Sequence, residues 1–283
     1  MRGVAVLVTV ALAGVLALAG CGAGEGPAAP ASATAVPTLP PVPGVEGEVV
    51  RSRTDEALGG QVQVRLTDTG DEPFTVTAVA LRSPGFAAQP LTQQTAVYRP
   101  GLTIDLPVPF GAVDCAAPVA PVAAEVVLSR AGGPVETVLV PLAGDVLDRV
   151  HEQGCRVQQL LTLVDVAVEG PVGSGEEVTA SLVLTRVAGS PDVDVEVRAL
   201  GRSVLLAPTV DDGLPATLRA GRDELVLPLT VELVSCEPHV LAETKKPFVF
   251  PLTVRVDGED TVLDLPLDDA QRDGLQALVD RVC

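Results

Sequence analysis

The chain has 283 residues, of which 47% are hydrophobic and only six are aromatic, and its 37 acidic and 19 basic side chains give a net charge of −18. It is long enough for one or two domains of ordinary size with an apolar core in each, which excludes a wholly disordered chain. The negative charge argues against nucleic-acid binding and against electrostatic attraction to anionic lipid, because both depend on clustered lysine and arginine.

The first twenty residues are typical of a secretory signal peptide. Arg2 precedes an uninterrupted run of 15 apolar and small residues, 3–17. A helical run of this length, rising about 1.5 Å per residue, is too short to cross a hydrocarbon core about 30 Å thick. We therefore predict that residues 1–20 are removed during export.

The sequence Leu18-Ala19-Gly20-Cys21 resembles the lipobox of bacterial lipoproteins. The resemblance implies that Cys21 receives a diacylglyceryl group, becomes the first residue of the mature chain and anchors it to the outer face of the cytoplasmic membrane. Setting Cys21 aside leaves four cysteines, an even number that suits disulfides in an oxidising compartment. The alternative is an ordinary secreted protein in which Cys21 is a spare thiol.

Residues 21–48 have the composition of a disordered tether. From residue 22 to residue 48 there are six prolines, five glycines and no aromatic residue. Such a segment buries too little apolar surface to offset the entropy cost of ordering it. We expect it to hold the folded part of the chain away from the membrane.

The rest of the chain divides into two related halves, 49–156 and 157–283. A Leu-Pro motif, at Pro107 in one half and Pro228 in the other, lies eight residues ahead of a cysteine in both. Matched positions are 118 residues apart near the start of the halves and 128 apart at their ends, as loop insertions would produce. This pattern predicts a duplicated domain with its boundary near Arg156.

Alternation of apolar and polar residues predicts the fold class. It is clear in 224–233, where every second residue from Leu225 is apolar, and it recurs in the segments 104–110, 178–184, 193–198 and 248–257. About seven such segments per half indicate an all-β fold of two tandem antiparallel β-sandwiches. They are immunoglobulin-like in outline only, because the core tryptophan and long cysteine spacing of antibody domains are absent. The prolines inside these segments predict edge or bulged strands.

Each half is expected to end in a short helix. Residues 268–282 carry apolar residues at helical spacing, with Asp268 as N-cap and Gln271 completing a capping box. Residues 145–153 form the shorter counterpart, and Gly154 is expected to stop that helix.

The four remaining cysteines allow three pairings, and the duplication selects one. Pairing Cys115 with Cys155 and Cys236 with Cys283 puts the same bridge in both copies, from a strand end to the end of the helix. Free or metal-binding thiols are the alternative, but no CxxC pair supports a zinc site.

Few residues suggest chemistry. His151 lies in a predicted helix, His239 lies in a predicted loop, and Ser174 lacks the GxSxG frame, so we expect a turn there and no enzymatic activity. No nucleotide-binding or metalloprotease motif occurs, and no cofactor is expected. Carbohydrate binding usually needs several exposed rings; Tyr98 is the one candidate, and Phe248, Phe250 and Phe110 are expected in the cores.

Acidic residues are concentrated in the second half. Residues 157–283 carry 22 acidic and 10 basic side chains, against 12 and 8 in residues 49–156. The segments 257–260 and 211–213 place carboxylates at turns, which suits either calcium or ordinary hairpins with a solvated acidic face.

The composition, rich in Ala, Val, Gly, Pro and Arg with two lysines, is typical of a high-GC genome. With its lipobox and tandem sandwiches, the chain resembles envelope lipoproteins of high-GC bacteria, a group without an assigned molecular role. We expect a non-catalytic interaction or scaffold module that is attached to the membrane through its lipid and meets an envelope protein partner. The alternative is that the acidic second half binds calcium or a basic partner.

Overall fold

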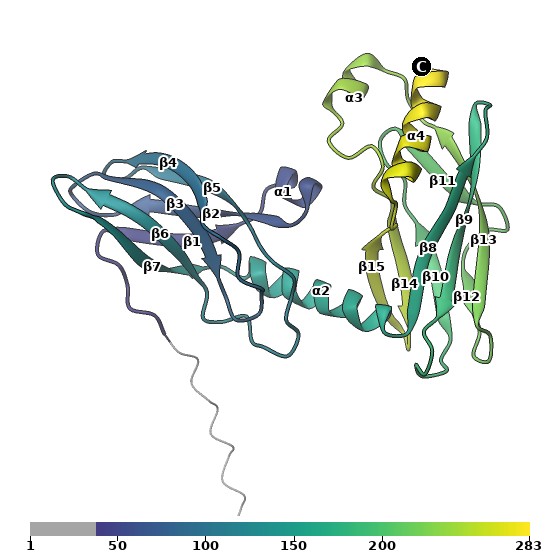
Figure 1. Ribbon diagram of the computed structural model, residues 1–283, viewed down its shortest axis with the longest axis horizontal. Coiled ribbons are helices and arrows are strands. Elements are labelled where there is room, and N and C mark those ends of the chain that lie inside the picture. Colours follow the sequence, from purple (N-terminus) through teal and green to yellow (C-terminus); the bar gives the residue numbers. More distant parts are fainter. Residues whose placement is uncertain (1–37) are drawn as a thin grey trace, which may run out of the picture. The chain divides into compact units, whose positions relative to one another are not determined.

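A computed structural model describes residues 38–283 of the chain. The predicted signal peptide, the predicted lipidation site Cys21 and the tether up to residue 37 lie outside the described residues. The described part consists mostly of β-strands with four helices, in the order shown in Figure 1. No helix within it is long and apolar enough to cross a membrane.

The first half forms one seven-stranded sheet in the order β4-β3-β6-β7-β1-β2-β5. All neighbours are antiparallel except β1 and β7, which pair in parallel over two residue pairs. Apolar residues on alternate positions of these strands form the first core, which includes Val64, Leu66, Val76 and Leu128. The strands are β1 Val45–Val50, β2 Gln61–Asp68, β3 Phe74–Arg82, β4 Thr92–Tyr98, β5 Thr103–Pro109, β6 Ala123–Arg130 and β7 Val135–Ala143.

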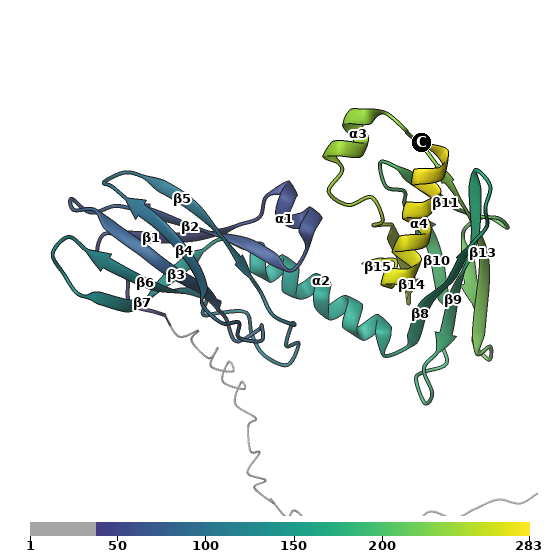
Figure 2. The same ribbon diagram turned by 45° about the horizontal axis from the view of Figure 1, so that its top comes forward.

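The second half contains two antiparallel four-stranded sheets, β11-β13-β9-β8 and β12-β10-β14-β15. Residues from both sheets, among them Leu182, Leu229, Val195 and Val254, form a second core, so the arrangement is sandwich-like (Figure 2). The strands are β8 Val164–Val172, β9 Glu177–Arg186, β10 Val195–Leu200, β11 Leu206–Val210, β12 Ala216–Leu218, β13 Glu224–Leu233, β14 Pro251–Val256 and β15 Glu259–Asp264.

The two halves share their strand pairing. The neighbours β1-β2-β5 correspond to β8-β9-β13, and β3-β6-β7 correspond to β10-β14-β15. The register is also shared: Gln63 pairs with Pro107 in the first half, and Ser181 pairs with Pro228 at the matching position of the second. The sequence match between the halves therefore corresponds to equivalent positions in space.

Helix α2, Val146–Leu161, is longer than predicted. Gly154 does not end it, and the predicted boundary at Arg156 lies inside it. A Cβ at position 154 would lie 2.9 Å from both γ-carbons of Val113, so this glycine allows close packing instead of terminating the helix. Leu147 at one end of α2 is buried in the first core, and Leu160 at the other end is buried in the second.

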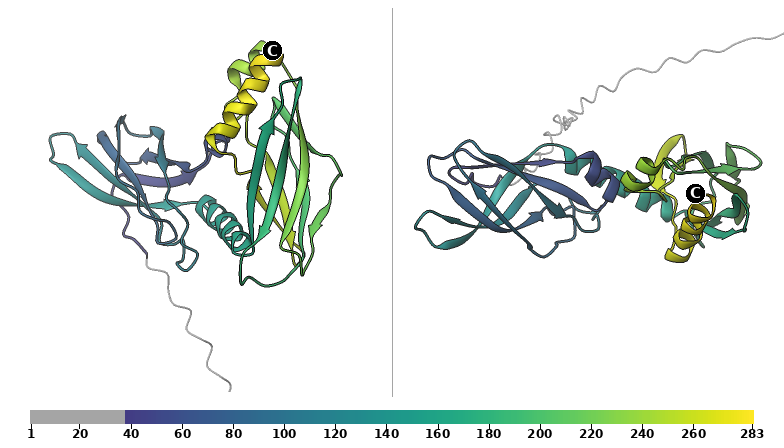
Figure 3. Two further views of the ribbon diagram at one scale, coloured as in Figure 1. Left: turned by 45° about the vertical axis from the view of Figure 1, so that its right-hand side comes forward. Right: turned by 90° about the horizontal axis from the view of Figure 1, so that it is seen from above.

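Helix α4, Asp269–Val282, confirms the predicted capping box. Asp268 accepts a hydrogen bond from the Gln271 backbone N–H at 2.7 Å, and Gln271 Oε1 accepts one from the Asp268 N–H at 2.8 Å. The apolar face of α4 supplies buried Leu275, Leu278 and Val279 to the second core. Figure 3 shows this helix, in yellow, beside the strands of the second half.

Two short helices, α1 Arg53–Leu58 and α3 Pro238–Glu243, were not predicted. In α1 the carboxylate of Asp55 is buried and accepts four hydrogen bonds, two from Ser52, one from Gln61 and one from Gln63. Burial alone would raise the pKa of Asp55, but these hydrogen bonds outweigh it and lower the pKa below its ordinary value. The carboxylate thereby fastens α1 to β2.

The tether is shorter than predicted, because β1 begins at Val45 and not after residue 48. Val45 and Val49 are buried on one face, and a Cβ at Gly47 between them would lie 2.5 Å from a methyl group of Leu142. Glycine at this position allows the close approach of β1 to β7. At least one of the glycines whose number indicated disorder is thus required for strand packing.

The prediction of edge strands for the prolines is confirmed for β5 and wrong for β13. Strand β5, with Pro107, lies at the edge of its sheet, whereas β13, with Pro228, lies between β11 and β9 without a bulge. The Pro228 carbonyl accepts a hydrogen bond from Asp211, just beyond the end of β11. Since N and O of one strand residue point to the same side, the missing N–H of Pro228 faces the place where β11 has ended.

Candidate functional site

Both predicted disulfides are present. Cys115 is joined to Cys155 and Cys236 to Cys283, closing separations of 40 and 47 residues. Cys283 is the C-cap of α4, as predicted, but Cys155 lies inside α2 because that helix continues past Gly154. Each bridge joins a loop that follows the Leu-Pro strand of its half to a helix.

The three residues considered for catalysis lie in three different elements of the fold. His151 lies in α2 as predicted and is half-buried, whereas His239 lies in α3 instead of a loop and is exposed. Ser174 lies in the turn between β8 and β9, as expected from its sequence. The structure brings none of these three side chains together in a hydrogen bond within residues 38–283.

Tyr98 is buried, contrary to the suggestion that it could present an exposed ring. Its ring stacks on Phe74 with centroids 4.6 Å apart, and burial, together with the charge of Asp105, raises the pKa of its hydroxyl. Phe250 is buried in the second core, and Phe248 and Phe110 pack against the cores, as predicted. The aromatic residues in the described part are therefore packing residues.

The acidic turn at 257–260 is a hairpin. Asp257 and Gly258 both have positive φ angles, of 50° and 88°, which suits the tight turn between β14 and β15. Arg255 binds the carboxylate of Asp260 through two hydrogen bonds, of 2.6 and 2.9 Å, and this contact lowers the pKa of Asp260. No group of three or more His, Cys, Asp or Glu side chains in the described part is arranged to hold a metal ion.

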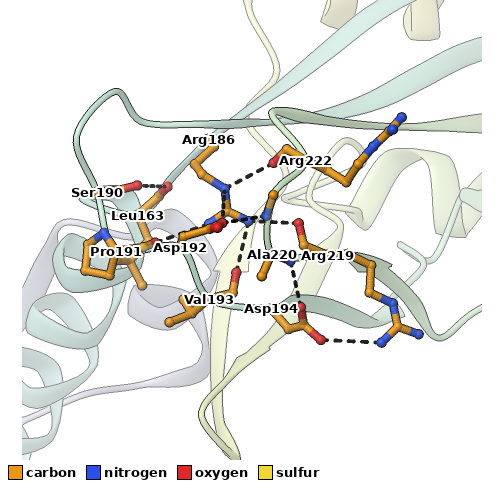
Figure 4. A network of polar contacts seen from close by, with 11 residues as sticks. Leu163, Arg186, Ser190, Pro191, Asp192, Val193, Asp194, Arg219, Ala220 and Arg222 are labelled. Carbon is orange, nitrogen blue, oxygen red and sulfur yellow. Dashed lines mark hydrogen bonds and ion pairs between the residues drawn. The ribbon is translucent and has the colours of Figure 1, made fainter.

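A network around Arg186 uses two further carboxylates of the second half (Figure 4). The Arg186 guanidinium is 10% exposed and donates to the backbone oxygens of Val193 and Arg222, at 2.9 and 3.1 Å. Asp192 and Asp194 accept hydrogen bonds from the backbone N–H groups of residues 221 and 220, each 2.7 Å long. These contacts fasten the loop after β9 to the turn before β13, so the two acids act as internal acceptors.

Other carboxylates of the second half lie together on the outer face of the sheet β11-β13-β9-β8. We call this the acidic face, and it consists of Asp165, Glu169, Glu177, Glu224 and Glu232. All five are exposed, and within residues 38–283 none of them forms an ion pair or a side-chain hydrogen bond. Arg186 is the one basic residue in these four strands, and its side chain is already engaged in the loop network.

The acidic face has two features that cost stability in the free protein. Glu232 lies directly opposite Glu177 across β13 and β9, and like charges at such positions repel. Val183 and Val226 pair on this face in the row next to Asp165 and Glu224; Val226 is 48% exposed, whereas Val183 is buried. An exposed apolar side chain among unpaired carboxylates is a feature of interaction surfaces.

An ion pair occupies the matching position in the first half. There Arg65 lies opposite Asp105 and binds it with two hydrogen bonds, of 2.7 and 2.9 Å. By the spacing of the repeats these two residues correspond to Val183 and Val226. The second half therefore lacks the ion pair that neutralises this face in the first.

The sequence predicted the acidic excess of the second half and, as one alternative, a solvated acidic face beside the turns, but it did not place that face on this sheet. Alternation within β8, β9 and β13 signalled that these carboxylates point outward. Their gathering on one surface depends on the strand order, and their lack of partners depends on where the arginines lie.

Comparisons with known proteins give little further information. No protein-family model matches the chain, and no curated protein matches its sequence. Among solved structures, the chain is similar to the crystal structure of red sea bream transglutaminase, with 12% identity and a TM-score of 0.23 over 81% of this chain and 32% of that one. The chain thus spans about a third of that protein's length, and a likeness at this TM-score does not bear on its function.

Proposed function

We propose that the chain is a lipid-anchored extracytoplasmic protein that serves as a non-catalytic interaction or scaffold module of the bacterial cell envelope, built of two tandem immunoglobulin-like β-sandwiches. The observation that carries the proposal is the repetition of one disulfide-braced unit, with the same strand neighbours and the same loop-to-helix bridge in both halves. Disulfides persist in oxidising compartments, which agrees with export. The lipobox-like Leu18-Ala19-Gly20-Cys21 supports the anchor.

In this proposal residues 1–20 are the signal peptide, and the tether runs from Cys21 to the start of β1 at Val45. The change from one sandwich to the next falls within α2. Mass spectrometry of the mature N-terminus tests the anchor, with a Cys21→Ser variant that should remain unacylated and leave the membrane fraction. Ser32→Ala, a change in the tether that spares the lipobox, is the matched control. An unacylated wild-type N-terminus would contradict the anchor.

The acidic face favours a basic protein partner over calcium as the second candidate function. Its five unpaired carboxylates lie on the same face as the exposed Val226, so a surface with arginine or lysine around an apolar contact would complement it in charge and polarity. Binding such a surface would also relieve the repulsion between Glu177 and Glu232.

A photo-crosslinking amino acid at position 226 in intact cells tests this candidate. We expect the adducts to contain a basic protein and to diminish when Glu177 and Glu224 are both replaced by lysine. A crosslinker at Val97, which is 53% exposed in the first half, is the control for non-specific contact. Equal adducts from both positions would contradict a docking role for the acidic face.

Two further measurements separate the alternatives. Calorimetric titration of the full chain with calcium should give no heat if the acidic face serves a basic partner. Turnover of any substrate in a panel of cell-wall and ester compounds by the full chain would contradict the non-catalytic role.

A further inference from the structure

The two disulfides lie in different chemical surroundings. In α4 the residue four positions before Cys283 is Val279, which is buried in the second core. In α2 the residue four positions before Cys155 is His151, whose Nδ1 and Nε2 lie 3.8 and 3.9 Å from the Cys155 sulfur. Because residues four apart lie on the same face of a helix, α2 places an imidazole beside one sulfur of its bridge.

Three contacts hold the imidazole of His151 in place. Its Nε2 lies 2.9 Å from the backbone oxygen of Asp114, and since a carbonyl oxygen only accepts, Nε2 carries the proton. The ring packs edge-on against Phe86, with centroids 5.7 Å apart, and lies so close to Gly85 that a Cβ there would be 3.0 Å from His151 Cδ2. Nδ1 is left as the nitrogen that can exchange a proton with sulfur.

The other sulfur of this bridge has the opposite surroundings. Cys115 is exposed and borders a pocket of about 440 Å³ that is also lined by Phe86 and Gln158. Its sulfur lies 3.3 Å from Gln158 Oε1, and the amide of Gln158 is oriented by a 3.0 Å hydrogen bond from Nε2 to the Val113 carbonyl. An amide oxygen accepts from a neutral thiol and disfavours a thiolate, so once reduced Cys115 would keep its proton more readily than Cys155.

We propose that Cys115–Cys155 is a thiol–disulfide exchange site, in which His151 stabilises the departing Cys155 sulfur, and that Cys236–Cys283 is a structural bridge without this activity. The reductant is a dithiol, as a small molecule or a protein. Its thiolate attacks the exposed Cys115 sulfur, the S–S bond breaks, and the electron pair leaves on Cys155, which takes up a proton beside the imidazole of His151.

The second thiol of the reductant completes the exchange. After losing its proton, it attacks the reductant's own sulfur in the mixed disulfide and displaces Cys115 as a thiolate, which then takes up a proton. The bridge gains two electrons and two protons in all, and the dithiol is oxidised to a disulfide. Reduction would remove the covalent link between α2 and the loop that joins β5 to β6.

Reduction rates of the two bridges in one folded molecule test the proposal. The full chain is treated with limiting dithiothreitol, free thiols are alkylated at intervals, and peptide mass spectrometry gives a rate for each bridge. We expect His151→Gln, which can keep the hydrogen bond to Asp114 but has no ring nitrogen that exchanges a proton, to slow reduction of Cys115–Cys155 about three- to ten-fold and to leave Cys236–Cys283 unchanged. His239→Gln, a change of the exposed histidine in α3, is the matched control.

The direction of the change separates this role from a structural one. A variant that merely loosens packing around α2 would expose the bridge and speed its reduction, so an unchanged or faster rate in His151→Gln overturns the proposal. An equal slowing of both bridges overturns it as well. With a monothiol such as glutathione, we expect the first adduct on Cys115, and an adduct found mainly on Cys155 would reverse the assignment of the attacked sulfur.

Discussion

Replacing Gly154 by alanine tests why a glycine lies in the middle of α2. Alanine is favoured over glycine inside a helix by about 1 kcal/mol. Against this, the new Cβ would lie 2.9 Å from both γ-carbons of Val113. Val113 cannot easily move away, because it forms a β-bridge with Phe86 and its carbonyl accepts from Gln158 at 3.0 Å. Overpacking of this kind costs about 1–3 kcal/mol, so we expect a net loss of about 1 kcal/mol.

Chemical denaturation followed by circular dichroism measures this loss, and a second background isolates its cause. In a Val113→Ala chain the γ-carbons are absent, so Gly154→Ala should gain the full helix preference of about 1 kcal/mol. The two backgrounds should therefore differ by about 2 kcal/mol. If Gly154→Ala stabilises the unaltered chain by about 1 kcal/mol, the contact with Val113 is not tight and the reasoning fails.

One pH titration and two further substitutions test other contacts. Tyr98 is the single tyrosine, and burial raises its pKa. The folded protein should therefore show no phenolate absorbance at the ordinary tyrosine pKa of about 10. The stability that the neutral hydroxyl contributes is complete below that pH and is lost as the pH rises through the folded pKa. Asp55→Asn should lower the free energy of unfolding at pH 7 by about 1–3 kcal/mol. Because the pKa of Asp55 is lowered, its contribution to stability is present above about pH 4 and is lost as the pH falls through the folded pKa. A variant whose stability follows the wild-type pH profile would contradict this. Glu232→Lys should raise stability by about 0.5 kcal/mol in thermal melts, because the lysine would pair with Glu177, and the gain should be smaller at high salt. Glu243→Lys in α3 is the control. An equal gain in that variant would refute the cross-strand explanation.

Features with a local or repeated signature could be predicted from the sequence. The capping box of Asp268 and Gln271 is defined by residues three apart, and both disulfides follow from matching the sequences of the two halves. The spacing of the copies also aligned Pro107 with Pro228, and both prolines occupy the same register position. In these cases all the information lies within one segment or in its duplicate.

Features that depend on distant neighbours were not predictable in the same way. Gly154 has the sequence context of a helix stop, and only its contact with Val113, 41 residues away, explains a glycine inside α2. Tyr98 beside Arg99 and Pro100 has the context of an exposed loop, yet its ring is covered by Phe74 from another strand. For the acidic face, the sequence gives the charge of each strand. Which carboxylates form ion pairs with arginine depends on the order of the strands in the sheet.

The continuity of α2 makes the two cores energetically interdependent. Its first turn is docked through Leu147 and its last through Leu160, and a free helix of 16 residues is only marginally stable in water. Melting of either core would therefore undock one end of α2 and weaken the hold of the other. A lesion confined to the first half, such as loss of the Cys115–Cys155 link, should lower the melting temperature of the second half as well, and calorimetry would record a coupled transition in place of two separate ones.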